Sequence, residues 1–105
     1  MIFVETTVFT KQVSVLLKPA EYQELQMMLL VRPDAGAIIR GSGGIRKIRW
    51  SYRGGGKRGG VRVIYYWAVS EEKILMLMMY PKNVQDNLSP AQIRLLRSIV
   101  EEDYL

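Results

Sequence analysis

Apolar positions in the first third of the chain repeat with the spacing of a helix. From Thr6 onward the repeat consists of Phe9, Val13, Leu16 and Leu17. The pair Lys18-Pro19 ends it, because the residue before a proline is pushed out of the helical conformation. A second helix fits from Pro19 to about residue 31, since proline suits the first helical position and a new apolar stripe follows. With a short strand at residues 2–4, this region is predicted to be a strand followed by a helical hairpin.

The middle of the chain changes from helical spacing to alternation. Residues 36–44 are rich in glycine and are predicted to be a connector. Residues 45–51 alternate, with Lys47, Arg49 and Ser51 on one face and Arg46, Ile48 and Trp50 on the other. After a glycine-rich basic loop at 53–60, β-branched and aromatic residues predict a strand at 61–68. Residues 74–80 are apolar at nearly every position, which is typical of a strand covered on both faces.

The end of the chain carries the clearest helix signal. Ser89 is a suitable N-cap, Pro90 fits the first helical position, and Gln92 completes a capping box of the S-x-x-Q type. An apolar face then runs along the helix to its end. With short links between three successive strands, the pattern predicts a single α+β domain over residues 1–105. Its small, mainly antiparallel sheet would lie between the helical hairpin and the C-terminal helix.

Two residue types are absent from the chain, and their absence narrows its chemistry. Without cysteine or histidine, neither a disulfide framework nor a zinc enzyme is expected, and the usual base of a serine or cysteine hydrolase is missing. Catalysis would have to use Lys, Arg, Tyr or carboxylate side chains, so we expect no metal and no cofactor. No signal peptide or membrane-spanning apolar run is visible, so we expect a cytoplasmic location.

Positive charge is concentrated in the middle of the chain. Lys and Arg outnumber Asp and Glu by 15 to 10, and residues 31–68 hold nine of the basic residues against one acid, Asp34. Such a patch attracts polyanions through counterion release, which favours a nucleic acid as the partner. The alternative is a solvated basic face that serves only solubility.

Three cations within this region are predicted to meet on one sheet face. Lys47 and Arg49 are two residues apart on one strand, and Arg62 lies close to them if strands 45–51 and 61–68 pair. Like charges repel unless an anion lies among them, and phosphate is the natural candidate. Alternatively, Arg62 is an edge-strand arginine that reaches past the sheet to water. The glycine-rich loop is no P-loop, because it lacks a Ser or Thr after the lysine and precedes a strand.

Other side chains near this face are candidates for contacts with RNA. Tyr66 is expected on the Arg62 face by alternation, while Tyr65 is expected in the core. Tyr80 ends the apolar strand, and its hydroxyl could lie at the rim of the same face. Aromatic side chains beside cations can stack unpaired bases, although core packing is the commoner role of a strand tyrosine. The candidate RNA-binding residues are Arg46, Arg53, Lys57, Arg58 and Tyr66.

The motifs together resemble those of a known toxin family. The runs Gly43–Arg49 and Gly56–Tyr66, then Tyr80 with Lys82-Asn83, closely resemble the HigB branch of RelE-like toxins. The similarity extends over almost the whole chain. It implies the RelE fold and an endoribonuclease that cleaves messenger RNA in the ribosomal A site and so inhibits translation. The ribose 2′-hydroxyl would attack the adjacent phosphate.

The resemblance also implies residue roles and partners. Arg62 would stabilise the transition state, Lys47 and Arg49 would bind phosphate, and Lys82 would match a basic position after the last strand. Where RelE has an arginine and a tyrosine, this chain has Asn83 and approximately Ser89, so the general base stays open between Tyr80 and Lys47. A HigA-like antitoxin with a helix-turn-helix would neutralise the toxin and contact operator DNA. It would dock on the last helix or on the basic face.

Two rival functions remain at this point. One is a basic RNA- or ribosome-binding module without catalysis, which explains the charge equally well. The other is a protein with the toxin fold that has lost its activity. Toxicity in cells and its dependence on Arg62 would distinguish them.

Overall fold

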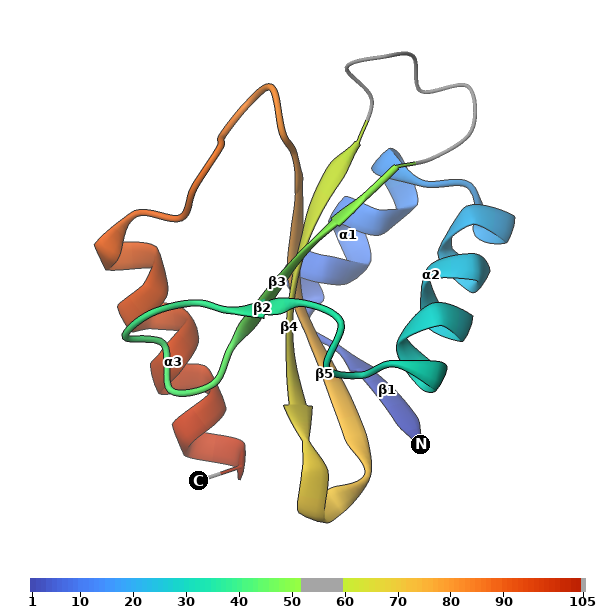
Figure 1. Cartoon of the computed structure of the whole chain (residues 1–105). Helices are drawn as coiled ribbons and strands as arrows, with labels where there is room; N and C mark the ends of the chain where they lie inside the picture. Colours follow the sequence, from blue (N-terminus) through green and yellow to red (C-terminus); the bar gives the residue numbers. More distant parts are fainter. Residues whose placement is uncertain (52–59, 105) are drawn as a thin grey trace.

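Within residues 1–51 and 60–104, which the computed structural model describes, the chain forms a five-stranded sheet with helices on both faces (Figure 1). The strands are β1 (Ile2–Glu5), β2 (Ala37–Ile38), β3 (Arg46–Trp50), β4 (Val61–Ala68) and β5 (Lys73–Pro81). The helices are α1 (Thr7–Leu16), α2 (Pro19–Val31) and α3 (Pro90–Tyr104), and a 3-10 turn spans Val69–Glu71. The α+β class predicted from the sequence is confirmed.

The strands lie in the order β1-β5-β4-β3-β2. The pairs β3–β4 and β4–β5 are antiparallel, which confirms the predicted meander, whereas β1 pairs with β5 in parallel. The prediction that residues 36–44 are only a connector was wrong, because Ala37 and Ile38 form β2 against Lys47 and Arg46. A strand of two residues is too short to show any alternation in the sequence.

Each face of the sheet packs against a different helical layer, and Figure 1 shows α1 and α2 on one side and α3 on the other. The face toward α1 and α2 is called here the hairpin face. Its buried residues are Phe9, Val13, Leu17, Leu25, Leu29, Val61, Val63, Tyr65, Ile74, Met76 and Met79. The opposite face, called here the α3 face, buries Ile45, Ile64, Leu75, Leu77, Tyr80, Leu96 and Val100. Strand β5 contributes to both clusters, as its continuous apolarity predicted.

A β-bulge interrupts the pairing of β4 with β5. Ile64 pairs with Met78 and Tyr65 with Met76, so Leu77 has no partner in the register. A bulge adds one residue to one strand and shifts the alternation of the residues that follow. Leu75 and Leu77 therefore lie on the α3 face. Tyr80 lies on the same face, although simple alternation from Leu77 would place it on the opposite one.

The helix ends follow the signals in the sequence. The Thr6 hydroxyl accepts a hydrogen bond from the Phe9 amide at 3.0 Å and caps α1. At α3, the Gln92 amide donates to Ser89 Oγ at 3.1 Å and the Ser89 amide donates to Gln92 Oε1 at 2.9 Å. This reciprocal pair is the predicted capping box. In the described part of the chain, no helix has the length and apolar character needed to cross a membrane.

A buried tyrosine fixes the link between α2 and β2. The Tyr65 hydroxyl donates to the Pro33 carbonyl at 2.7 Å and accepts from the Gly36 amide at 2.8 Å. A Cβ at Gly36 would lie 2.9 Å from the Tyr65 ring, so only glycine fits there without rearrangement. Burial raises the Tyr65 pKa above its ordinary value. The prediction that Tyr65 belongs to the core is confirmed.

Candidate active site

Three cations lie on the α3 face, at the end of the sheet where β3 ends and β4 begins. The register pairs Arg49 of β3 with Arg62 of β4, and Lys47 is two residues before Arg49 on the same strand. Paired residues on neighbouring strands have Cα atoms about 5 Å apart. The structure thus brings together Lys47, Arg49 and Arg62, called here the basic cluster, as the sequence predicted. Two like charges directly opposite each other destabilise a sheet unless another charge compensates.

Arg62 is held in a largely buried position. Its neighbours Val61 and Val63 are fully buried on the hairpin face, so alternation turns Arg62 to the α3 face. Its side chain is only 13% exposed. An edge arginine that only reaches for water would be mostly exposed, and β4 is an internal strand of the sheet. The buried position favours a role in binding an anion over solvation alone.

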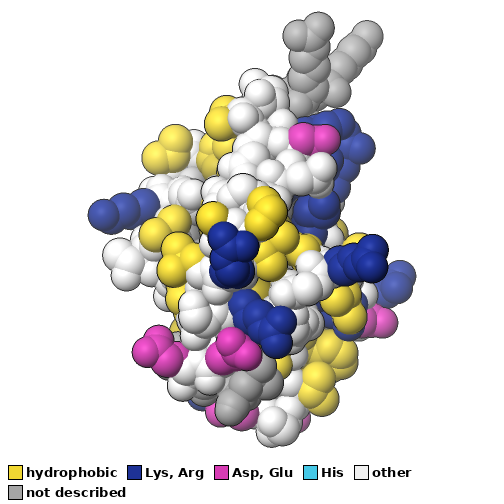
Figure 2. Space-filling model, turned by 90° about the vertical axis from the view of Figure 1, so that its left-hand side faces the viewer, with side chains coloured by type: hydrophobic (Ala, Val, Ile, Leu, Met, Phe, Trp, Pro, Cys, Tyr) yellow, Lys and Arg dark blue, Asp and Glu magenta, His cyan; other side chains and the backbone are white. Residues whose placement is uncertain are grey.

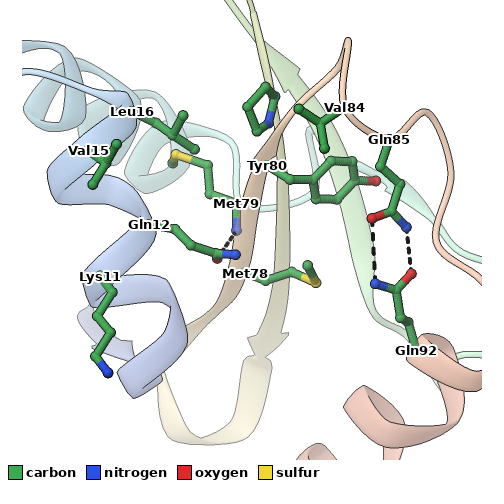
Figure 3. Close-up of a pocket in the computed structure, with 11 residues that line it drawn as sticks. Lys11, Gln12, Val15, Leu16, Met78, Met79, Tyr80, Val84, Gln85 and Gln92 are labelled. Carbon is green, nitrogen blue, oxygen red and sulfur yellow. Dashed lines mark hydrogen bonds between the residues drawn. The ribbon is translucent and has the colours of Figure 1, made fainter.

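Tyr80 lies next to Arg62 across the sheet, because the two residues pair in the β4–β5 register. The expectation that its hydroxyl lies at the rim of the face was wrong, since the residue is 5% exposed and the hydroxyl itself is buried. The segment after β5 covers it, and Figure 3 shows Val84 and Gln85 beside the ring. Burial raises the Tyr80 pKa, while the positive charge of Arg62 acts in the opposite direction.

The segment of residues 82–89, called here the strap, connects β5 to α3 and contacts the basic cluster. Asp86 Oδ1 lies 3.3 Å from Arg62 Nη2, and Lys47 Nζ donates to Asn87 Oδ1 at 3.0 Å. Figure 2 shows Lys and Arg side chains gathered at the upper right of the α3 side, with an acidic side chain against them. Asp86 and Asn87 were not predicted from the sequence, because a polar link between a strand and a helix carries no spacing signal.

A groove borders Tyr80 at the free edge of β5. It encloses about 540 Å³ and lies between α1 on one side and the strap on the other (Figure 3). Strand β1 ends at Glu5, which pairs with Met76, so the later residues of β5 have no strand beside them on this edge. A side chain from α1 binds the backbone of β5 there instead. Gln12 Oε1 accepts a hydrogen bond from the Met79 amide at 2.8 Å. The groove is mainly apolar, and no sequence pattern predicted it.

The other predicted site residues lie in different places. Arg46 lies with its neighbour Ile48 away from the basic cluster, and its Nη1 donates to the carbonyls of Asp34 and Gly36 at 3.1 and 2.8 Å. Tyr66 is on the α3 face as predicted, but four residues along β4 from Arg62, where it packs against Gly44. Lys82 directly follows β5, and its amide donates to the Gly60 carbonyl at 3.4 Å. Arg53, Lys57 and Arg58 lie outside the described residues.

The arrangement can bind a phosphate group and act on protons beside it. Guanidinium and ammonium groups hold phosphate oxygens and stabilise the charge that develops at phosphorus. A buried tyrosine whose pKa is raised stays protonated and can donate a hydrogen bond. The described residues contain no group of three His, Cys, Asp or Glu side chains placed to hold a metal ion.

Comparison with known proteins identifies the family of this chain. A family model described as the RelE toxin of the RelE/RelB toxin–antitoxin system matches residues 33–103, from the link before β2 into α3. Among solved structures, a mutant of the E. coli toxin RelE in the free state matches with a TM-score of 0.57 at 16% identity. The match covers 81% of this chain and 86% of that chain. The matched span contains the basic cluster, Tyr80 and the strap, and the chain belongs to the RelE toxin family.

Proposed function

We propose that this protein is an endoribonuclease toxin that cleaves messenger RNA in the ribosomal A site and thereby inhibits translation. The observation that carries the proposal is the basic cluster beside Tyr80 on the α3 face. Three cations on one sheet face suit a phosphodiester, and the chain belongs to a toxin family in which this chemistry is expected. The HigB-like branch within the family stays a prediction from the sequence motifs.

The proposed reaction is attack of the ribose 2′-hydroxyl on the adjacent phosphate, which forms a 2′,3′-cyclic phosphate and breaks the bond to the 5′-oxygen of the next nucleotide. The 2′-hydroxyl gives up its proton to a base, and the departing 5′-oxygen gains a proton and leaves as a hydroxyl. In this scheme Arg62 binds the phosphate oxygens and stabilises the negative charge of the transition state. Lys47 and Arg49 bind the phosphate from β3, and Lys82 adds a further cation after β5. The side-chain cations neutralise the developing charge, so the proposed reaction requires no metal or cofactor.

The state of Tyr80 constrains its role in this scheme. Because burial raises its pKa, the neutral hydroxyl is the favoured form at physiological pH. A neutral hydroxyl donates a hydrogen bond, so Tyr80 suits the stabilisation of a phosphate or leaving-group oxygen. We therefore propose Tyr80 as a hydrogen-bond donor in this reaction and not as the acceptor of the 2′-hydroxyl proton. This assignment narrows the choice that the sequence left open.

The proposed partners follow from the family and the charge. The ribosome and messenger RNA are the proposed substrate complex, and Arg46, Arg53, Lys57, Arg58 and Tyr66 are proposed as further RNA contacts. A HigA-like antitoxin with a helix-turn-helix is proposed to neutralise the toxin, and operator DNA would be bound through that antitoxin. We propose that the toxin acts in the cytoplasm, where its substrate is.

The test is a primer-extension map of messenger 5′ ends in a purified translation system with and without the protein. We expect new breaks within ribosome-occupied codons, and we expect Arg62→Ala to reduce their rate by at least about 100-fold, as removal of a group that stabilises transition-state charge commonly does. Arg32→Ala is the control, because it removes the same charge from an exposed position at the end of α2.

The outcomes separate the proposed function from its rivals. Breaks that persist with Arg62→Ala at the wild-type rate would refute the proposed site. An intact message with translation still blocked would identify a binding module without catalysis. No effect on message or translation would identify a protein that keeps only the fold.

A further inference from the structure

The strap holds the basic cluster through one carboxylate and one amide. Among the described residues, the polar contacts of Arg62 and Lys47 outside the backbone pairing go to Asp86 and Asn87. Both contacts are with oxygen atoms, which are also the atoms that a phosphate group presents. Asp86 and Asn87 thus occupy the place of an anion on the α3 face.

Asp86 and Asn87 do not satisfy all the polar groups around Arg62. Asp86 reaches Arg62 through a single oxygen at 3.3 Å, which is longer than the usual 2.7–2.9 Å of a charge-assisted hydrogen bond. Arg62 Nε and the Tyr80 hydroxyl are both buried, and neither has a hydrogen-bond partner in the described part of the chain. Buried polar atoms without partners are rare and unfavourable. An anion with more oxygens than one carboxylate can satisfy these groups better than Asp86 does.

The strap is anchored at its two ends, and a hydrogen bond of 2.8 Å from Gln85 Nε2 to the Asn87 carbonyl closes the turn around Asp86. Near β5, the amides of Val84 and Gln85 donate to the Pro81 carbonyl at 3.2 and 3.4 Å. Near α3, Gln92 pairs with the side chain of Gln85 and closes the capping box with Ser89 (Figure 3). Asp86 lies between these anchors, and its side chain is 69% exposed. Its contact with Arg62 can therefore open while both ends of the strap stay in place.

We propose that Asp86 and Asn87 act as an internal substitute for the RNA phosphate, which the substrate displaces when it binds. The proposal rests on the proposed function for the identity of the substrate. In the free protein the strap compensates the repulsion within the basic cluster and keeps weak anions out. The apparent affinity for RNA equals the intrinsic affinity reduced by the fraction of molecules in which the strap is open.

The variant Asp86→Asn tests this proposal, because it removes the charge and keeps the shape of the side chain. The probe is a short single-stranded RNA with 2′-O-methyl groups, which block the attacking hydroxyl, and its affinity is measured by fluorescence anisotropy. An exposed ion pair is weak, and Asp86 also repels the RNA, so we expect Asp86→Asn to bind roughly three- to tenfold more tightly than the wild type.

The control is Glu71→Gln, which makes the same change of net charge at an exposed position between β4 and β5. It should change the affinity less than twofold. In an Arg62→Ala background, Asp86→Asn should tighten binding less than it does in the wild type, since the ion pair is already lost and only the repulsion between Asp86 and the RNA remains. Thermal unfolding of each variant shows whether it is folded.

Equal or weaker RNA binding by Asp86→Asn, compared with Glu71→Gln, would overturn the proposal. Slower cleavage with unchanged RNA binding would also overturn it, because Asp86 would then position Arg62 for the reaction. The binding assay does not depend on cleavage, so the two proposals fail separately. If Asp86→Asn binds RNA more tightly but the wild type cleaves no RNA, only the proposed nuclease function is contradicted. If cleavage depends on Arg62 but Asp86→Asn does not bind RNA more tightly, only the proposed role of the strap is contradicted.

Discussion

The hairpin face and the α3 face of the sheet share the same strands but differ in how completely they are covered. On the hairpin face, Val61, Val63 and Tyr65 of β4 are fully buried, and Trp67 is partly buried. On the α3 face, one helix packs against part of the sheet (Figure 1), and the strap contacts the end that carries the basic cluster.

The hairpin face supplies most of the buried core, whereas the α3 face carries the basic cluster. A chain of 105 residues has few apolar side chains to spare, so one face supplies most of the core. The other face can then carry cations that repel each other, because the hairpin face offsets their unfavourable free energy. Alternation along β4 allows neighbouring residues such as Arg62 and Val63 to serve the two purposes.

The largest effect on stability is expected from the hairpin face. Phe9→Ala should lower the free energy of unfolding by about 3–5 kcal/mol, because it leaves a cavity at a fully buried position beside Tyr22. Arg49→Ala on the α3 face should change it by less than about 0.5 kcal/mol, since the side chain is exposed. Urea denaturation measures both. A loss of stability in Arg49→Ala as large as in Phe9→Ala would contradict the division between the faces.

A smaller effect is expected from the buried hydroxyl on the hairpin face. Tyr65→Phe should lower the free energy of unfolding by about 1–3 kcal/mol at neutral pH, because the Gly36 amide loses its partner. The effect should shrink in alkali. The Tyr65 pKa is raised in the folded protein. The Tyr65 hydroxyl therefore contributes fully to the free energy of unfolding at pH values below its ordinary pKa of 10.0, and this contribution is lost as the pH rises further.

Urea midpoints of the wild type and Tyr65→Phe between pH 8 and 11 measure this effect. The two curves should converge above about pH 10, where the unfolded tyrosine loses its proton. Parallel curves would show that the folded hydroxyl titrates at its ordinary pKa. The difference between the two proteins removes the contribution of lysines, which titrate in the same range.

The smallest effect is expected at the start of α3, which closes the strap. Ser89→Ala should lower the free energy of unfolding by about 1 kcal/mol, because the Gln92 amide loses its cap. Hydrogen exchange at the Gln92 and Ile93 amides should become faster. Ser98→Ala is the matched control inside the same helix, and it should be neutral or slightly stabilising. Unchanged exchange in Ser89→Ala would mean that Pro90 and packing alone fix the helix start.

Most of the fold was predictable because its signals are local. The break at Lys18-Pro19, the capping box at Ser89 and the alternation of residues 45–51 each depend on residues close together in the chain. Alternation also predicted that Lys47 and Arg49 share a face and that Tyr66 joins the face of Arg62. The strand β2 escaped prediction because its two residues depend on pairing with β3 for their conformation.

The sequence by itself determined the order of the elements, the caps and the concentration of positive charge, because these follow from backbone preferences and composition. Only the tertiary structure decided what surrounds Arg62. The bulge at Leu77 depends on the pairing of β4 with β5, and it places Tyr80 on the Arg62 face. Asp86 meets Arg62 across 24 positions of the chain because the strap folds back over the sheet. Such contacts depend on packing between distant segments, which no local pattern encodes.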